Sequence, residues 1–276
     1  MLPMLDSPLL ACLDSLRSKR AMLRSERKSV RTLVLGGSPA DYGFDPGVCP
    51  GAFNLASRGE DLHYAFLLYD RLWRKLPALA NIVVFYSAFS SGHVSEWNAA
   101  LDNHCLAMNE IFRLGRLYEN ETMLALARRL RGQLMADGVP IPGIRGFLPG
   151  HDKGFMPEAF DGEAMVAAIK AFRGGADADV YLARMLILAR HLGHRVLVVV
   201  PPVRSDVVHA MGRDTGWVFG SLHEIVDDYR PELSLELLDC HGDRRFGDDC
   251  FGDCSHLDPS GQGTRTLSGL IRERLA

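Results

Sequence analysis

The stretch TLVLGGS, residues 32–38, decides the fold class, because an uninterrupted apolar run ends there in two glycines and a serine. Such a run is typical of a strand that is buried on both faces, as in a parallel sheet covered by helices. Four further short runs rich in strand-forming residues follow it. The predicted strands span Thr32–Gly36, Ala52–Ala56, Ile82–Ser87, Arg195–Val200 and Leu235–Asp239.

Longer segments between these strands carry apolar residues at helical spacing. The predicted helices span Glu60–Leu76, Glu96–Leu114, Glu119–Met135, Glu163–Phe172, Asp179–Leu192, a pair between Asp206 and Tyr229, and Ser260–Leu275. Strands that alternate with helices predict a three-layer α/β/α domain with a five-stranded parallel sheet.

We divide the chain into an N-terminal helical extension, residues 1–31, and an α/β domain, residues 32–276, with a helical insertion at about 90–178. The extension has a stripe of leucines followed by a basic stretch that includes Arg17, Lys19 and Arg20. We expect it to pack on the domain and to expose a solvated basic face. A helix that binds a membrane surface or a partner is the alternative.

The insertion leaves the third predicted strand at its carboxyl end, where ligands bind in open α/β sheets. It contains a stretch rich in proline and glycine, residues 138–154. We expect it to form a lid or a substrate wall. The alternative is that it only packs on the sheet or forms the interface of a homo-oligomer.

The composition is that of an ordinary globular protein: 276 residues, 47% hydrophobic and 24% charged, with a formal net charge of -3. This charge gives no general attraction to nucleic acid, so no nucleic-acid partner is expected. The chain lacks the run of about 20 apolar residues that a membrane span needs. Pro3, Asp6 and Asp14 interrupt the first leucines, which argues against a secretory signal and predicts a cytoplasmic protein with its cysteines as thiols.

Ser38 is a candidate nucleophile, since Gly36 and Gly37 before it allow a sharp turn and close approach of a substrate. The amide of Ser38 can then point towards a developing oxyanion. A glycine-glycine-serine turn by itself is also typical of an ordinary loop.

Asp253 and His256 are the candidate partners of this serine, and they lie just before the last predicted helix. An aspartate three residues before a histidine on a tight turn can accept from Nδ1, which leaves Nε2 free to take the serine proton. The same spacing also fits a helix cap followed by a surface histidine.

In order and position, these blocks resemble those of the SGNH (GDSL-like) hydrolases and O-acyltransferases. A second block, an asparagine with an oxyanion-hole glycine five residues later, is similar to residues 54–59, which read NLASRG. The resemblance covers residues 32–276 and implies a flavodoxin-like fold and an oxyanion hole formed by the amides of Ser38 and Gly59.

The resemblance also implies a serine esterase or O-acyl(acetyl)transferase that works through an acyl-enzyme without a cofactor. The branch it resembles most is associated with bacterial surface-glycan biosynthesis, with Gly37, Ser38 and residues 42–46 (YGFDP) similar to its first block. The implied substrate is therefore a small-molecule or glycan ester, such as a carbohydrate or glycan-precursor ester.

Two positions depart from the family pattern. Gly37 stands where the better-known branch has aspartate, and Phe89 replaces the asparagine that normally ends the third block. One lost oxyanion donor costs about 2.7 to 4 kcal/mol of transition-state stabilisation. Ser87, Ser90 and Asn98 are candidate replacements. The departure also keeps open a different function, a catalytically degenerate protein that binds glycans or acts as a scaffold.

Four further residues are candidates for contact with the substrate because each lies in a loop near the carboxyl edge of the predicted sheet: Arg58, Ser87, His93 and Arg204. The two arginines can hold a carboxylate or a phosphate, or can form structural ion pairs instead.

A zinc site is the main rival interpretation of the C-terminal region. Its candidate ligands crowd into seventeen positions: Cys240, His241, Cys250, Cys254 and His256. The spacing lacks the paired knuckles of structural zinc sites, so we expect buried or half-buried thiols and no metal, with a disulfide as a further alternative.

Overall fold

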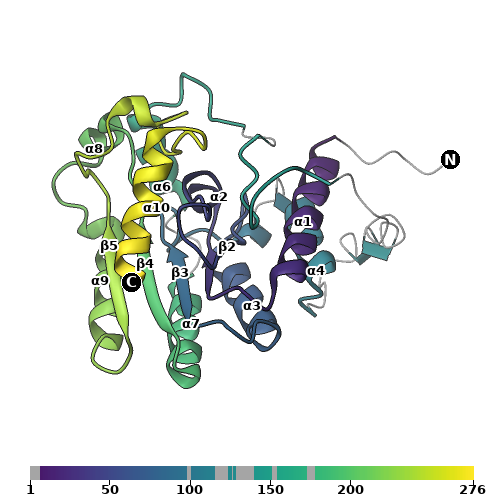
Figure 1. The fold of residues 1–276 in the computed structure, drawn as a ribbon. Coiled ribbons are helices and arrows are strands. Elements are labelled where there is room, and N and C mark those ends of the chain that lie inside the picture. Colours follow the sequence, from purple (N-terminus) through teal and green to yellow (C-terminus); the bar gives the residue numbers. More distant parts are fainter. Residues whose placement is uncertain are drawn as a thin grey trace.

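The computed structural model describes residues 7–97, 101–115, 124–125, 127–128, 140–150, 154–172 and 178–276. Its centre is a five-stranded, all-parallel sheet in the order β2-β1-β3-β4-β5 (Figure 1). The strands span Thr32–Leu35 (β1), Ala52–Asn54 (β2), Asn81–Phe85 (β3), Arg195–Val200 (β4) and Leu235–Asp239 (β5). The predicted α/β fold class is thus confirmed. β1, β2 and β3 end before their predicted ends, whereas β4 and β5 have the predicted bounds.

The sheet separates two hydrophobic cores, because successive side chains of a strand point to opposite faces. Leu33, Leu35 and Val84 belong to the larger core and Val34 and Val83 to the smaller one. The larger core is completed by α3 (Leu62–Leu72), α7 (Asp179–Leu192) and α9 (Gly216–Tyr229). The smaller core is completed by α2 (Ser38–Gly43) and α10 (Gln262–Leu275). Both faces of the sheet are therefore covered, which explains the continuous apolar runs of the strands.

Seven further helical elements complete the described part of the chain. They are α1 (Ser7–Glu26), a 3-10 helix (Trp73–Lys75) after α3, a 3-10 helix (Ser95–Trp97), α4 (Asp102–Phe112), α6 (Gly162–Phe172), α8 (Ser205–Met211) and a 3-10 helix (Asp248–Cys250). The predicted helix Asp179–Leu192 has its predicted bounds. The predicted helix Glu60–Leu76 was too long, since Asp61 caps α3 by accepting from the Tyr64 N–H.

The insertion is described only in part. The predicted helix Glu96–Leu114 corresponds to α4, which begins later, at Asp102. The predicted helix Glu119–Met135 lies largely outside the described residues, as does Asn98. The segment of the insertion around Arg145 lies along the edge of β2. There the Asn54 N–H donates to the Arg145 carbonyl at 2.8 Å. Pairing of this kind protects an edge strand from association with other chains.

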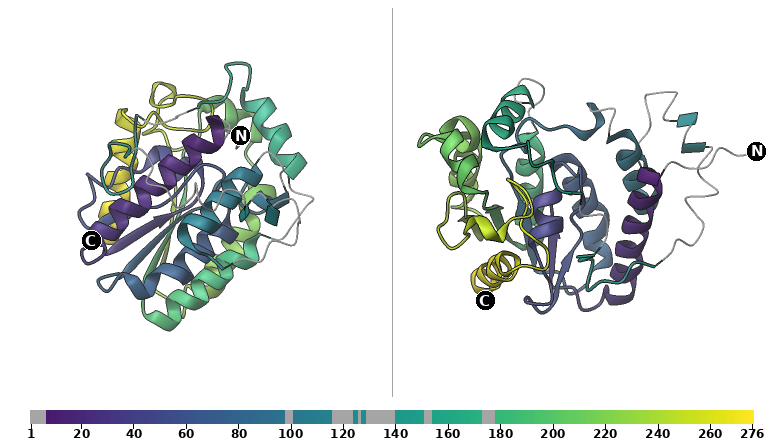
Figure 2. Two further views of the ribbon diagram at one scale, coloured as in Figure 1. Left: turned by 90° about the vertical axis from the view of Figure 1, so that its right-hand side faces the viewer. Right: turned by 90° about the horizontal axis from the view of Figure 1, so that it is seen from above.

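The N-terminal extension is part of the fold, because α1 packs beside α4 beyond the β2 edge of the sheet (Figures 1 and 2). Leu13, Leu16 and Leu23 of α1 are buried in the larger core. The predicted solvated basic face is correct for the exposed positions Arg24, Arg27, Lys28 and Arg31.

The same prediction is wrong for Lys19, whose side chain is 0% exposed. Its Nζ donates to Asp41 Oδ1 at 2.7 Å and to the Ala56 carbonyl at 2.6 Å. A charge in the protein interior is stable only when it is paired and hydrogen-bonded, and both conditions are met here. Lys19 therefore joins α1 to α2 instead of facing water.

Among the described residues, no helix combines the length and the apolar character that crossing a membrane requires.

Candidate active site

The carboxyl ends of β1 and β3 mark the point where the strand order reverses, which is where doubly wound sheets bind their ligands. Three sequence-predicted residues lie in the segments that follow β1, β2 and β3: Ser38, Gly59 and Ser87. All three line one cavity of about 200 Å³, together with His256.

Ser38 is the first residue of α2, a short helix that the sequence did not predict. Pro39 suits this position, because the first turn of a helix has no carbonyl partner for its N–H groups. Gly36 has a φ of 132°, and a side chain on it would lie 2.9 Å from Cβ of Phe85. A glycine is therefore required where the chain turns from β1 into the helix that carries Ser38.

Asn54, the asparagine of the second sequence block, holds α2 in place. Its Nδ2 donates to the carbonyls of Ala40 at 2.9 Å and Phe44 at 2.8 Å. Its Oδ1 accepts from the Ala56 N–H at 3.1 Å. Because this side chain is fully buried, its amide makes these hydrogen bonds with backbone and not with a ligand.

Ser38, His256 and Asp253 form a continuous chain of hydrogen bonds. His256 Nε2 lies 2.7 Å from Ser38 Oγ, although 218 positions separate the two residues in the sequence. His256 Nδ1 lies 2.7 Å from Asp253 Oδ2. The structure thus brings together the three residues that the sequence singled out for catalysis, in the geometry of a nucleophile, a base and an orienting carboxylate.

Asp253 accepts several hydrogen bonds besides the one from His256. Its Oδ1 accepts from the N–H groups of Ser255 and His256, each at 2.8 Å, and its Oδ2 accepts from the Met156 N–H at 2.9 Å. Burial by itself raises the pKa of this carboxyl, but the hydrogen bond and charge of His256 and the backbone donors hold the pKa well below its usual range. Asp253 is therefore an ionised acceptor that fixes the histidine ring.

Met156 belongs to the insertion, so the insertion contributes a hydrogen-bond donor to Asp253. Tyr42 reinforces this link: its ring stacks on His256 with centroids 4.6 Å apart, and its hydroxyl donates to the Gly154 carbonyl at 3.2 Å. The sequence reasoning assigned no role to either residue. Residue type and spacing do not reveal these contacts, because folding alone brings Tyr42 against His256 and Met156 against Asp253.

Gly59 borders the same cavity as Ser38 and has a φ of 75°. A side chain on it would lie 2.9 Å from Leu101, so this position also requires glycine. As the first residue of α2, Ser38 has no carbonyl one turn earlier to accept from its N–H. Ser38 and Gly59, whose amides the family resemblance assigns to an oxyanion hole, thus line one cavity.

A buried polar network lies behind Gly59. Glu60 accepts from the Gly36 N–H at 3.0 Å and from Ser57 Oγ at 3.2 Å, and burial raises its pKa well above the usual value. Ser57 Oγ lies 3.4 Å from His104 Nε2, and His104 Nδ1 lies 3.3 Å from Cys12 Sγ on α1. Burial lowers the pKa of His104 to about 4. The network connects the loop that contains Gly59 to the N-terminal helix.

The third sequence block forms a turn that lacks the family's asparagine. Ser90 Oγ accepts from the Ser87 N–H at 2.9 Å, and Ser87 Oγ accepts from the Phe89 N–H at 3.3 Å. Phe89 packs edge-on against Phe172 at 5.7 Å, and both rings line the 200 Å³ cavity. The position that carries an amide in the family thus carries an apolar wall in this chain.

His93 and Arg58 lie near the serine in different surroundings. His93 lines the same cavity as Ser87, and burial lowers its pKa. Arg58 is exposed and lines a second cavity of about 410 Å³ that also borders Ser38 and His256.

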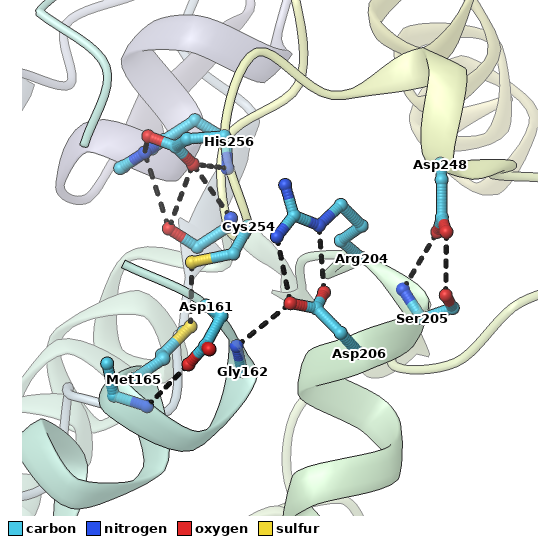
Figure 3. Close-up of polar contacts among 12 residues, drawn as sticks. Asp161, Gly162, Met165, Arg204, Ser205, Asp206, Asp248, Cys254 and His256 are labelled. Carbon is cyan, nitrogen blue, oxygen red and sulfur yellow. Dashed lines mark hydrogen bonds and ion pairs between the residues drawn. The ribbon is translucent and has the colours of Figure 1, made fainter. Parts of the chain in front are cut away.

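Arg204 forms a structural ion pair, which is one of the two roles that the sequence analysis gave for it. It lines neither of the two cavities described above, and its guanidinium binds both carboxylate oxygens of Asp206 at 2.8 Å (Figure 3). Asp206 in turn accepts from the Gly162 N–H at the start of α6. The Arg204 backbone N–H donates to the Cys254 carbonyl at 3.0 Å, so this pair supports the loop that carries Asp253 and His256.

The cysteines of the C-terminal region are free thiols. Cys240 and Cys254 are buried, Cys250 is half-buried, and Cys254 Sγ contacts Met165 Sδ at 3.8 Å (Figure 3). The described His, Cys, Asp and Glu side chains, which include all five proposed zinc ligands, form no group of three arranged to hold a metal ion. His256 is instead bonded to Ser38 and Asp253.

No protein-family model matches the chain, and a search of curated proteins finds no match. Only the geometry of the site and the sequence resemblance therefore inform the function.

Proposed function

We propose that this protein is a serine esterase or O-acyltransferase of the SGNH type that acts on a carbohydrate or glycan-precursor ester. The observation that carries the proposal is the continuous hydrogen-bond chain from Ser38 Oγ through the His256 ring to Asp253, with both links at 2.7 Å. A serine, a histidine base and an ionised, multiply bonded aspartate in this order are the parts of nucleophilic acyl transfer.

The reaction has two steps. Ser38 Oγ attacks the ester carbonyl carbon and gives its proton to His256 Nε2, while the amides of Ser38 and Gly59 donate to the oxyanion. The carbon–oxygen bond of the ester breaks, and the departing alcohol oxygen takes the proton from His256. Water or an acceptor hydroxyl then gives its proton to His256 while its oxygen attacks the carbonyl carbon of the acyl-enzyme. The bond between this carbon and Ser38 Oγ breaks, Ser38 Oγ takes the proton back from His256, and the acid or the new ester leaves. Asp253 remains ionised and holds the ring throughout.

A protein that keeps the fold and binds glycans without catalysis is the second candidate, and Phe89 is the observation that favours it. Phe89 offers no donor where the family has an asparagine, so the oxyanion hole has two amides in place of three donors. The intact Ser38–His256–Asp253 chain opposes this alternative.

We also propose a cytoplasmic location. The support is that all six cysteines are free thiols, as is typical of proteins in a reducing compartment.

Reaction with a fluorophosphonate probe tests the proposal, because only an activated serine reacts with it at an appreciable rate. We expect the pure protein to be labelled at Ser38, as mapped by peptide mass spectrometry, and Ser38→Ala to remain unlabelled. A His256→Asn variant should lose about 10²- to 10⁴-fold in labelling rate while it stays folded, because general base catalysis contributes that range.

Ser260→Ala is the matched control, since this exposed serine lies outside the site. It should be labelled at the same rate as the wild type. No labelling of folded wild-type protein would refute the catalytic proposal and favour the glycan-binding alternative. Equal labelling of wild type and His256→Asn would exclude His256 from the mechanism.

A further inference from the structure

Two cavities meet at the candidate nucleophile. Four residues line both of them: Ser38, Gly59, Met156 and His256. The 200 Å³ cavity extends from this shared wall over the carboxyl ends of β3 and β4, and the 410 Å³ cavity extends towards α1 and α4. A group bound covalently to Ser38 Oγ therefore has two separate spaces to enter.

The smaller cavity has a largely apolar lining, although it also includes His241, whose ring nitrogens have no hydrogen-bond partner among the described residues. Side chains from four elements or their loops enclose it: Phe85, Phe89, Met165, Phe172, Val203 and Phe219. Its two carboxylates are already occupied, since Glu60 accepts from Gly36 and Ser57, and Asp61 accepts from Tyr64 and Ser95. The cavity thus offers a large apolar surface and no carboxylate without a donor.

The larger cavity has a more polar lining than the smaller one. Its polar lining residues include Ser15 of α1, Asn103 and His104 of α4, and the exposed Arg58. Hydroxyl, amide and guanidinium groups suit a ligand with several hydroxyl groups.

We propose that the apolar cavity binds an acyl chain larger than acetyl, of about four to eight carbons, and that the polar cavity binds the hydroxyl-bearing alcohol part of the ester. This assignment rests on the proposed acyl-transfer function. In the tetrahedral intermediate on Ser38 Oγ, the acyl chain and the alkoxy group point in different directions from the central carbon. The alkoxy oxygen must also stay within reach of His256, which borders both cavities.

The size of the apolar cavity determines the class of acyl group. One water-sized group takes about 15 Å³ of such a space, so an acetyl group would leave most of the 200 Å³ empty. An unfilled apolar cavity forgoes contacts, whereas each methylene that enters it from water raises affinity by about fourfold. A chain that reaches Val203 and Phe219 fills the space.

The alcohol cavity depends on the N-terminal helix. Ala11, Cys12, Ser15 and Leu16 of α1 line it, and Lys19 fixes the helix to α2. The extension thus forms a wall of the substrate site.

The first test measures kcat/KM of the wild type for p-nitrophenyl acetate, butyrate, hexanoate and palmitate, beside fluorophosphonate labelling of Ser38. We expect kcat/KM to rise at least about tenfold from acetate to hexanoate and to fall again for palmitate, whose chain exceeds the cavity.

The second test narrows each cavity separately. Val203→Phe should lower the hexanoate-to-acetate ratio of kcat/KM at least about fivefold, whereas Val180→Phe, an exposed position on α7, should keep the ratio. Ser15→Trp should lower the ratio of a hexanoyl methyl glucoside to p-nitrophenyl hexanoate at least about fivefold. Ser25→Trp, on the exposed side of the same helix, should keep that ratio.

The outcomes separate this inference from the proposed function. If Ser38 is labelled but acetate is the best ester, the acyl assignment is wrong and the catalytic proposal stands. If Ser15→Trp changes the chain-length ratio and Val203→Phe changes the sugar ratio, the two cavities have the opposite roles. If Ser38 is not labelled and no ester is cleaved, both the function and the inference fail. If Val203→Phe does not fold, the kcat/KM values of the wild type for the four p-nitrophenyl esters still decide whether the apolar cavity binds the acyl chain.

Discussion

The serine side and the histidine side of the candidate site are supported by ion pairs of different kinds. On the serine side, Lys19 and Asp41 join α1 to α2 in the interior, with side chains 0% and 8% exposed. On the histidine side, Arg204 and Asp206 join the loop of His256 to α6 at the surface, with side chains 30% and 35% exposed. Both pairs have good geometry, so burial is the main physical difference.

Burial changes what each pair does for the molecule. Loss of one partner of a buried pair leaves a charge without solvent or counterion, whereas a surface pair is largely replaced by water. We therefore expect the nucleophile to depend on the N-terminal helix more than the base depends on Arg204. Three perturbations test this difference, in order of decreasing effect.

Lys19→Met should have the largest effect, because it removes the buried ammonium group that neutralises the Asp41 carboxylate. We expect the free energy of unfolding to fall by about 3 to 5 kcal/mol, as measured by urea denaturation. The matched control is Arg24→Met on the exposed face of the same helix, which should change stability by about 0.5 kcal/mol or less.

The double variant Lys19→Met/Asp41→Leu removes both charges and should regain much of the lost stability, since apolar pairs often replace buried ion pairs without loss. A single Lys19→Met effect as small as that of Arg24→Met would show that the two sides of the site do not differ.

The second largest effect should be the loss of stability at low pH that protonation of His104 causes on the serine side. The pKa of His104 is lowered by burial from 6.5 to about 4, so between these values the unfolded chain binds a proton that the folded chain does not. Stability from the neutral ring is complete above pH 6.5 and is lost as the pH falls towards 4, by on the order of 3 kcal/mol.

Unfolding free energies of wild type and His104→Gln between pH 7 and pH 4 measure this contribution. The difference between the two proteins isolates it from Glu60, whose raised pKa acts with the opposite sign as the pH rises. The wild type should lose more stability than His104→Gln, and the exposed control His223→Gln should follow the wild type. Parallel curves for wild type and His104→Gln would contradict the prediction.

Arg204→Gln should have the smallest effect, about 1 kcal/mol or less, because its pair is partly solvated. The hydrogen bond from Arg204 lowers the pKa of Asp206 to about 2, so stability from this carboxylate is present above pH 3.8 and is lost only as the pH falls towards 2. Stability at pH 7 and the rate of Ser38 labelling check the prediction. A loss of unfolding free energy comparable to that of Lys19→Met would show that the two sides of the site depend equally on their ion pairs.

Local patterns were sufficient for the strands and for several helices. β4, β5 and α7 have their predicted bounds. Residues that break regular structure mark two of these ends, since Pro201 follows β4 and Gly193 follows α7. α2 was not predicted, because a six-residue segment with Pro39 and Gly43 has no measurable helical period and reads as a turn. The same limit applies to α4, whose start at Asp102 has no side-chain cap to mark it.

The site was predictable where chemistry is carried by residue type and spacing. Ser38, Asp253 and His256 were identified from the sequence, and the structure brings them into contact. Arg204 was predicted as a candidate ligand for a substrate anion, but its guanidinium binds an aspartate two positions away. The residue type of Arg204 predicts that it binds a carboxylate, but it does not reveal that the carboxylate belongs to Asp206.

The sequence by itself determined the α/β class, the positions of the strands and the three residues of the hydrogen-bond chain, since these depend on periodicity and on residue chemistry within short segments. Only the tertiary structure decided that Lys19 is buried against Asp41, that Tyr42 stacks on His256 while Met156 donates to Asp253, and that the N-terminal helix forms a cavity wall. These contacts join segments far apart in the chain, and their energies come from burial, which no local pattern encodes.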